Sequence, residues 1–171
     1  MVGRRLVAVA GVALLALGAS SAAAEPLKMT ILYKLAEQTR YDIPLPDSEK
    51  HWVRIAKFTG TVEGGGPFDG AQATEMGFHD VFPGKGGIGA PLYHVLALKG
   101  GGTVTLRGDR ELIVIPTGTD KPATVYFGHW RILGGTGAMT GIQGAGTYRI
   151  SPLSPTESRL EFEGHFSPPK P

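Results

Sequence analysis

Residues 127–150 read F-G-H-W-R-I-L-G-G-T-G-A-M-T-G-I-Q-G-A-G-T-Y-R-I, and this stretch decides the fold. Its polarity alternates into a glycine cluster and alternates again on leaving it, which is typical of one strand, a tight reversal and a second strand. The six glycines from Gly134 to Gly146 allow positive φ angles and close approach of neighbouring backbones. The stretch therefore predicts two paired strands of a strongly bent sheet.

Short alternating segments separated by turn signals continue on both sides of this hairpin. The expected strands are 52–63, 72–82, 92–98, 103–107, 111–115, 123–133, 146–150 and 159–166. The expected loops and turns are 42–47, 64–67, 83–91, 100–102, 108–109, 116–122 and 152–155. Residues 27–37 fit either a strand or a short helix. About eight short strands with little helix favour an antiparallel barrel or a sandwich.

Glycines inside the strands favour the barrel. Such glycines relieve crowding where a sheet curls on itself, and the sequence places them at Gly60, Gly77, Gly128, Gly146 and Gly164. Closure also removes the exposed strand edges that an open sheet has to protect. We therefore expect an all-β fold with a single antiparallel β-barrel of about eight strands. The barrel domain is expected at 51–166, after an N-terminal segment at 25–50 and before a tail at 167–171.

The first 24 residues have the pattern of a signal peptide. Arg4 and Arg5 precede an apolar run at 6–17, and Ala22-Ala23-Ala24 supplies the small residues that a signal peptidase needs. The apolar run is shorter than the roughly 20 residues of a spanning helix. We expect cleavage before Glu25, a periplasmic or secreted protein, and no membrane span after cleavage.

Composition narrows the function classes. The chain has 17 Lys+Arg and 15 Asp+Glu, so without Arg4 and Arg5 the two totals are 15 and 15 and the formal charge is zero. A balanced charge does not favour a nucleic-acid partner. The absence of cysteine excludes disulfides, thiol nucleophiles and thiolate metal sites. Stability must therefore come from packing and from closure of the sheet.

The segment W-R-I-L-G-G-T-G-A-M-T-G-I-Q-G-A-G-T-Y at 130–148 resembles the late-strand motif of the allene oxide cyclase and dirigent β-barrel superfamily. A looser similarity covers 58–108, where F-T-G-T-V, G-F-H-D-V-F and G-G-T-V-T-L-R-G follow the same strand order. The resemblance implies an eight-stranded antiparallel barrel whose apolar lumen holds a hydrophobic small molecule. The plant cyclases act on an oxylipin epoxide, dirigent proteins steer phenoxy radical coupling, and small exported bacterial proteins share the barrel. No catalytic residue of the plant families is matched to a position in this chain.

Two kinds of site are disfavoured by the spacing of the residues. A dinucleotide loop needs a helix to begin after its glycines, but strand alternation resumes at 147–150. His79, His94 and His129 lie in three different strands, without the short spacing of a metal site. We therefore expect neither a cofactor nor a metal.

General acid–base chemistry remains open. Glu75 and His79 share one face of one strand, so both can address the lumen, and these two are the catalytic candidates. The ligand-binding candidates are His94, His129, Trp130 and Tyr148, the last two as apolar walls. The alternative is that the polar faces form the outside of the barrel.

The leading hypothesis is an exported β-barrel that binds a small hydrophobic ligand in its lumen. One alternative is a cyclase, isomerase or dirigent-type coupling guide that acts on such a molecule. Another is a non-catalytic envelope or interaction protein whose barrel is packed solid. An open apolar cavity with Glu75 or His79 turned inward would favour the first two, and the sequence leaves the oligomeric state undecided.

Overall fold

The computed structural model describes residues 23–47, 49–118 and 123–169. The signal-peptide prediction falls almost wholly outside the described residues, and so does the end of the expected tail. The strands within the described ranges are β1 (Glu25–Leu35), β2 (Tyr41–Pro44), β3 (Trp52–Gly64), β4 (Gln72–Phe82), β5 (Gly86–Ala97), β6 (Thr103–Ile115), β7 (Ala123–Gly135), β8 (Gln143–Ser154) and β9 (Glu157–Ser167). Three short 3-10 turns join them: η1 (Glu37–Thr39), η2 (Gly66–Phe68) and η3 (Gly137–Met139).

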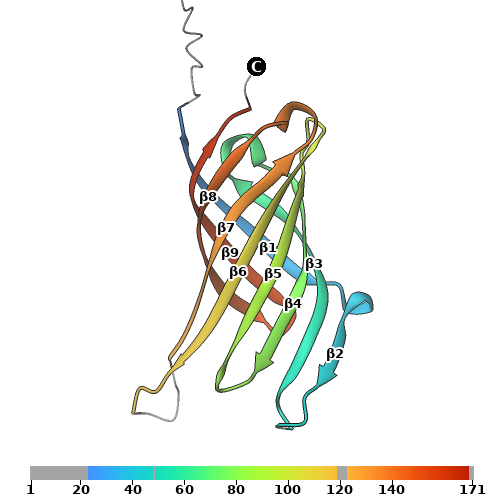
Figure 1. The fold of residues 1–171 in the computed structure, drawn as a ribbon, viewed down its shortest axis with the longest axis vertical. Helices are drawn as coiled ribbons and strands as arrows, with labels where there is room; N and C mark the ends of the chain where they lie inside the picture. The colour runs from blue at the N-terminus through green and yellow to red at the C-terminus, as the bar shows by residue number, and fades with distance from the viewer. Residues whose placement is uncertain (1–22, 48, 119–122, 170–171) are drawn as a thin grey trace, which may run out of the picture.

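Eight of these strands close into an antiparallel barrel (Figure 1). The strand order is β1-β9-β8-β7-β6-β5-β4-β3, and β1 pairs with β3 to complete the ring. β3 changes partner along its length, because residues 58–64 pair with β1 and residues 52–55 pair with β2. β2 therefore lies beside the ring at its lower end (Figure 1). The expected all-β barrel of about eight strands is confirmed.

The segment 25–50, expected to lead into the barrel, supplies the strand that closes it. β1 forms ladders with both β9 and β3. Its pattern of alternating buried and exposed residues over Leu27–Leu35 is that of a strand with one face on the core. Within the described ranges no helix combines the length and the hydropathy that crossing a membrane requires.

Several expected loops are partly or wholly strand, including the loop predicted at 152–155, because β8 continues to Ser154 and Pro152 pairs with Ser158. The turn predicted at Gly108–Asp109 is wrong, because β6 runs unbroken through it and Gly108 pairs with both Leu92 and Trp130. The loop predicted at 83–91 is strand from Gly86 onward, in a ladder with β6. The loop predicted at 42–47 begins with β2. Pro44 is the last residue of β2, which is an edge strand, so the N–H that proline lacks does not interrupt a hydrogen-bond ladder.

The lumen glycines make room for large side chains as well as for curvature. A Cβ on Gly146 would lie 1.9 Å from the carbonyl oxygen of Glu163 and 2.8 Å from Nε1 of Trp130. A Cβ on Gly128 would lie 2.4 Å from Cζ of Tyr148. Real Cβ atoms do not approach so closely, so glycine at these positions lets the neighbouring rings lie flat against the barrel wall.

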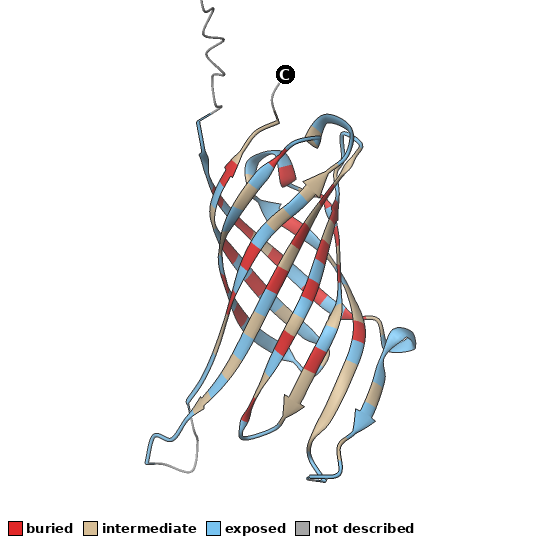
Figure 2. Ribbon diagram, viewed as in Figure 1, coloured by how far each residue is buried: buried red, intermediate tan, exposed pale blue. Residues whose placement is uncertain are grey.

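The two ends of the lumen differ. At the upper end in Figure 1, η2 and the loop after η3 cover the opening, and Phe68 packs edge-on against Phe166 at 5.4 Å. The core around them is apolar and almost fully buried: Leu27, Met29, Ile31, Val62, Ala73, Leu96, Val104, Leu106, Ile142 and Phe162. Buried positions gather in the middle and upper part of the barrel (Figure 2). We call this region the closed end and the opposite region the open end.

Candidate functional site

A group of ionisable side chains lies inside the barrel between the closed and open ends. Glu75 and His79 come from β4, His94 from β5 and Arg110 from β6. Glu75 and His94 are directly opposed in the β4–β5 ladder, so their side chains leave the same face of the sheet. Glu75, His79 and His94 are at most 2% exposed. The face of β4 that carries Glu75 and His79 is therefore the lumen face, and the alternative that it forms the outside is wrong.

Glu75 lies between two imidazoles and a guanidinium. Its Oε1 is 3.8 Å from Nε2 of His79 and 3.9 Å from Nη1 of Arg110, and its Oε2 is 3.7 Å from Nδ1 of His94. These separations exceed hydrogen-bonding distance but allow strong electrostatic interaction in a buried site. The carboxylate is surrounded by potential donors without being bound by any of them.

His79 is held as a neutral ring. Nη2 of Arg110 donates to Nδ1 of His79. A guanidinium can only donate, so Nδ1 is the acceptor and the ring proton is on Nε2, the atom nearest Glu75. Burial, followed by the positive charges of Arg110 and Arg54, lowers the pKa of His79 to about 2. His79 therefore carries no charge near neutral pH.

His94 belongs to an aromatic pocket beside Glu75. Its Nδ1 is 3.1 Å from the hydroxyl of Tyr33. Its ring contacts Phe162 edge-on at 5.4 Å and Tyr148 at 5.9 Å. Burial lowers the pKa of His94, although the nearby charge of Glu75 opposes this effect. Burial also raises the pKa of the Tyr33 and Tyr148 hydroxyls, and Glu75 adds to both shifts.

Several polar atoms of this group have no hydrogen-bond partner among the described residues. They are Oε1 of Glu75, Nε2 of His79, Nε2 of His94 and the hydroxyl of Tyr148. The last two lie close together, since a Cβ on Gly108 would be 3.1 Å from each. An unpaired buried polar group costs about 1–3 kcal/mol, so a fold optimised only for stability would not retain four in one place. This cost marks the group as a candidate functional site.

A cavity of about 200 Å³ opens beside this group at the open end of the barrel. Phe58, Val81, Leu112, Tyr126 and Ile150 form its apolar walls. The β8–β9 turn contributes to its rim through residues 154–158. His79 and Arg110 also line the cavity, while Glu75 lies directly behind them. The cavity therefore has apolar walls and a polar floor, as small-molecule sites commonly have.

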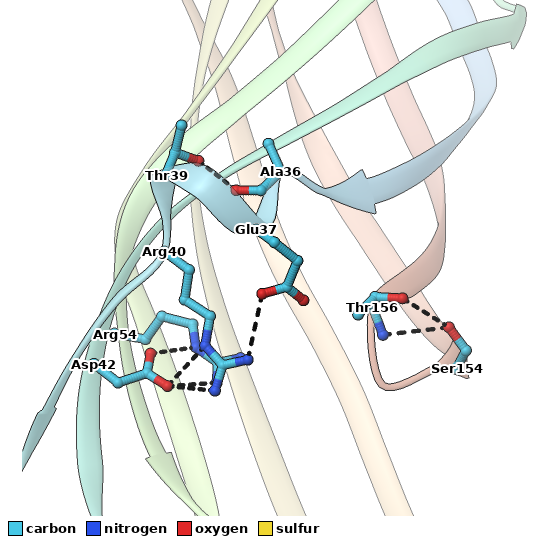
Figure 3. A network of polar contacts seen from close by, with 8 residues as sticks. All are labelled: Ala36, Glu37, Thr39, Arg40, Asp42, Arg54, Ser154 and Thr156. Carbon is cyan, nitrogen blue, oxygen red and sulfur yellow. Dashed lines mark hydrogen bonds and ion pairs between the residues drawn. The ribbon is translucent and has the colours of Figure 1, made fainter.

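Arg54 lies at the edge of the same cavity and is fixed by Asp42 of β2 (Figure 3). Nε and Nη2 of Arg54 donate to the two carboxylate oxygens of Asp42 at 2.7 and 3.0 Å. Arg40 also donates to Asp42 and is 3.7 Å from Glu37 (Figure 3). Bonding to the two arginines lowers the pKa of Asp42, against the opposing effect of burial. The short strand β2 thus holds a cavity-lining guanidinium in place.

The structure brings together some, but not all, of the six candidate residues that the sequence indicated. Glu75, His79, His94 and Tyr148 lie together inside the barrel. Trp130 is buried in the core, where Nε1 donates to the carbonyl oxygens of residues 147 and 163. His79 is the only one of the six candidates that lines the cavity.

His129 lies apart from the group. It is exposed on the outer face of β7, because Gly128 and Trp130 on either side of it face inward. Consequently the three histidines considered for a metal do not converge. Among the described residues no group of three or more His, Cys, Asp or Glu side chains is arranged to hold a metal ion.

Sequence reasoning missed Arg54, Arg110 and Tyr33. Arg54 shares its alternating face with Ala56 and Phe58, which was a usable signal for an inward direction. Arg110 follows Leu106 and Gly108 at steps of two, but the turn expected at 108–109 broke that pattern. Tyr33 fell in the segment that fitted either a strand or a helix.

Comparison with known proteins supports the fold. No protein-family model matches the sequence, and no curated protein matches it. The solved structure of the pterocarpan synthase dirigent protein GePTS1 superposes with a TM-score of 0.50 and 13% sequence identity, covering 95% of this chain and 98% of that one. The pterocarpan synthase dirigent protein PsPTS1 gives a TM-score of 0.49 and 14% identity over 89% of this chain and 99% of that one. The superposition on GePTS1 confirms the resemblance to the dirigent-like barrel at the level of the fold.

Proposed function

We propose that this protein binds a small molecule with an apolar body in the cavity at the open end of the barrel. The observation that carries the proposal is the cavity itself, with apolar walls and with the buried His79 and the partly buried Arg110 at its floor. A barrel packed solid, as expected of a purely structural protein, would have neither the space nor the unpaired polar atoms.

The volume sets the size of the ligand. At about 200 Å³ the cavity is somewhat larger than the roughly 150 Å³ engineered cavity that holds benzene. It suits a compound of one or two rings better than a long-chain lipid. Recognition would rest on shape, with the polar floor fixing the orientation of the ligand.

A pair of serine variants tests the proposal, with indole as the probe and ligand-observed NMR as the measurement. Ser158 lies on the inward face of β9 and lines the cavity, so Ser158→Trp should fill it and abolish binding. Ser151 is exposed on the outer face of β8, so Ser151→Trp is the matched control and should bind indole as the parent does. Unchanged binding by Ser158→Trp would show that the ligand is held elsewhere.

A second candidate function is catalysis of a cyclisation, isomerisation or guided coupling in the same cavity. The observation that favours it is Glu75, whose Oε1 has no hydrogen-bond partner among the described residues and lies behind His79. A carboxylate in this position can accept a proton from a substrate in the cavity through one intervening water, and His79 would position it. Native mass spectrometry of the purified protein would identify a co-purified ligand. Glu75→Gln should then abolish its conversion but leave its binding intact, and full activity in that variant would remove Glu75 from the mechanism.

We further propose that the protein is exported. The signal-like residues 4–24 support this, and β1 begins at Glu25, so that cleavage at the expected position leaves every strand intact. Intact-mass measurement of the protein recovered from outside the cytoplasm should give a chain that starts at Glu25. A full-length mass there would contradict the proposal.

A further inference from the structure

We propose that the ligand of this cavity carries a carboxylate, which Arg54 and Arg110 bind at the cavity floor. The inference rests on the proposed binding function and specifies its ligand class.

The inward charged side chains that line the cavity are two arginines, whereas the carboxylate of Glu75 lies behind Arg110 and the carboxylate of Asp42 on β2 pairs with Arg54. Arg54 lies on the β3 face that also carries Ala56 and Phe58, and Arg110 lies on the β6 face that carries Leu106. Both guanidiniums line the cavity, and their side chains are 16% and 24% exposed. Partly buried guanidiniums are weakly hydrated and match the planar geometry of a carboxylate.

The acidic residues at the rim point elsewhere. Asp80 is on the outer face of β4, where its carboxylate is 2.7 Å from Nε2 of His51. Glu157 is 3.7 Å from the Lys34 ammonium on the neighbouring strand. Glu111 is exposed on the outer face of β6. None of the three opposes an anion at the cavity floor.

The two arginines lie on either side of the neutral ring of His79. Arg54 is its cross-strand partner in the β3–β4 ladder, and Arg110 donates to its Nδ1 from the other side. Each guanidinium has five N–H donors, and the single bond to His79 leaves donors of Arg110 for another acceptor. Glu75 is 3.9 Å away and therefore does not saturate Arg110 by hydrogen bonding.

Gly89 lets Arg110 reach this position. A Cβ on Gly89 would lie 2.8 Å from both Cγ and Nε of Arg110 and 3.2 Å from its Cδ. The arginine side chain thus crosses β5 in the space that the glycine leaves empty. Gly89 does not have a positive φ angle, so Gly89→Ala is tolerated by the backbone and displaces mainly the flexible arginine.

Benzoate and benzamide are the probes that test the inference, because they have the same size and differ in charge. Their dissociation constants for the protein are measured by isothermal titration calorimetry and by chemical-shift titration. We expect benzoate to bind at least about tenfold more tightly than benzamide, as a charge-assisted bidentate pair provides. Arg110→Gln and Gly89→Ala should each remove this preference. Arg107→Gln is the matched control, because Arg107 lies on the same strand, has a 37% exposed side chain and pairs with Asp109 on the outer face.

The outcomes separate the inference from the function on which it rests. Equal binding of the two probes, or a benzoate preference that persists in Arg110→Gln, overturns the carboxylate inference and leaves the binding function intact. Binding of neither probe overturns both. Far-UV circular dichroism and unfolding curves check that Gly89→Ala and Arg110→Gln fold as the parent does. If one variant does not fold, the other variant is compared with the parent. The ratio of their dissociation constants for benzoate and benzamide then decides whether the carboxylate inference holds.

Discussion

The closed and open ends of the barrel are built from the same eight strands and the same alternation, yet they are filled differently. At the closed end the inward positions carry Leu, Met, Ile, Val and Phe, and the interior is packed. Toward the open end the inward positions include Glu75, His79 and Arg110, and the cavity opens beside them. Burying charges is expensive and packing apolar groups is favourable, so we assign the stability of the barrel to the closed end and the proposed binding function to the open end.

The largest expected effect comes from breaking the closed end. Phe68 is 1% exposed and packs on Phe166, so Phe68→Ala should lower the free energy of unfolding by about 3–5 kcal/mol. Urea denaturation followed by circular dichroism measures the loss. Phe78→Ala is the control, because Phe78 is 41% exposed on the outer face, and it should cost less than about 1 kcal/mol. Similar losses in the two variants would mean that the closed end is not the stabilising half.

The next largest effect is expected at the inward-facing glycines that make room for aromatic rings between the two ends of the lumen. Gly128→Ala places a methyl group 2.4 Å from Cζ of Tyr148 and 2.6 Å from the Asp109 carbonyl oxygen, which should cost about 1–3 kcal/mol. Gly134→Ala on the same strand meets no atom within 4 Å and should be neutral or slightly stabilising. Thermal unfolding of both variants compares them. Equal melting temperatures would argue against the flat packing of Tyr148.

The open end should also make stability depend on pH. The folded-state pKa values of His79 and His94 are lowered by burial, so below about pH 6.5 the unfolded chain binds protons that the folded chain does not. The contribution of these two histidines to stability should be level above that pH and should fall as the pH drops toward 4. His79 should contribute a slope approaching about 1.4 kcal/mol per pH unit, and His94 a slope of the same sign. His79→Leu should reduce the slope, and His129→Gln on the outer face should unfold as the parent does. An unchanged slope in His79→Leu would show that this ring is not held neutral.

The smallest effect is expected at β2, which lies outside the closed ring. Asp42 accepts hydrogen bonds from Arg40 and Arg54 in a partly exposed cluster (Figure 3), so Asp42→Asn should cost about 1 kcal/mol or less. Because bonding to the arginines lowers the Asp42 pKa, this contribution is present above the ordinary aspartate range and is lost in acid. Benzoate affinity is the sharper measurement, since it should fall if Asp42 positions Arg54. A loss of several kcal/mol would instead make β2 part of the stabilising core.

The barrel was predictable from sequence because its signals are local. Alternation over 52–63 and 72–82, together with glycines such as Gly146, is sufficient to indicate curled antiparallel strands. Strand ends were less predictable, since Gly86 and Gly108 resemble turn residues when their ladder partners are unknown.

The site was only partly predictable, because alternation separates two faces without saying which one is inside. On β4 the usual rule is reversed: Met76 and Phe78 are exposed, and Glu75 and His79 are buried. The pairing of Glu75 with His94 depends on register, which a single strand does not encode. Arg110 joins the group only because Gly89 on another strand makes room for it.

The most direct test of the difference between the two ends is to replace the ionisable side chains toward the open end with apolar side chains like those of the closed end. The triple variant Glu75→Met, His79→Leu, Arg110→Met replaces the charged pair and the neutral imidazole between its members with apolar groups of similar size. Its free energy of unfolding in urea at pH 7 should equal that of the parent or exceed it by about 1–4 kcal/mol, and binding of benzoate should be lost. A variant that is several kcal/mol less stable than the parent would show that the buried ionisable group holds the barrel together, which would contradict a functional role for the open end.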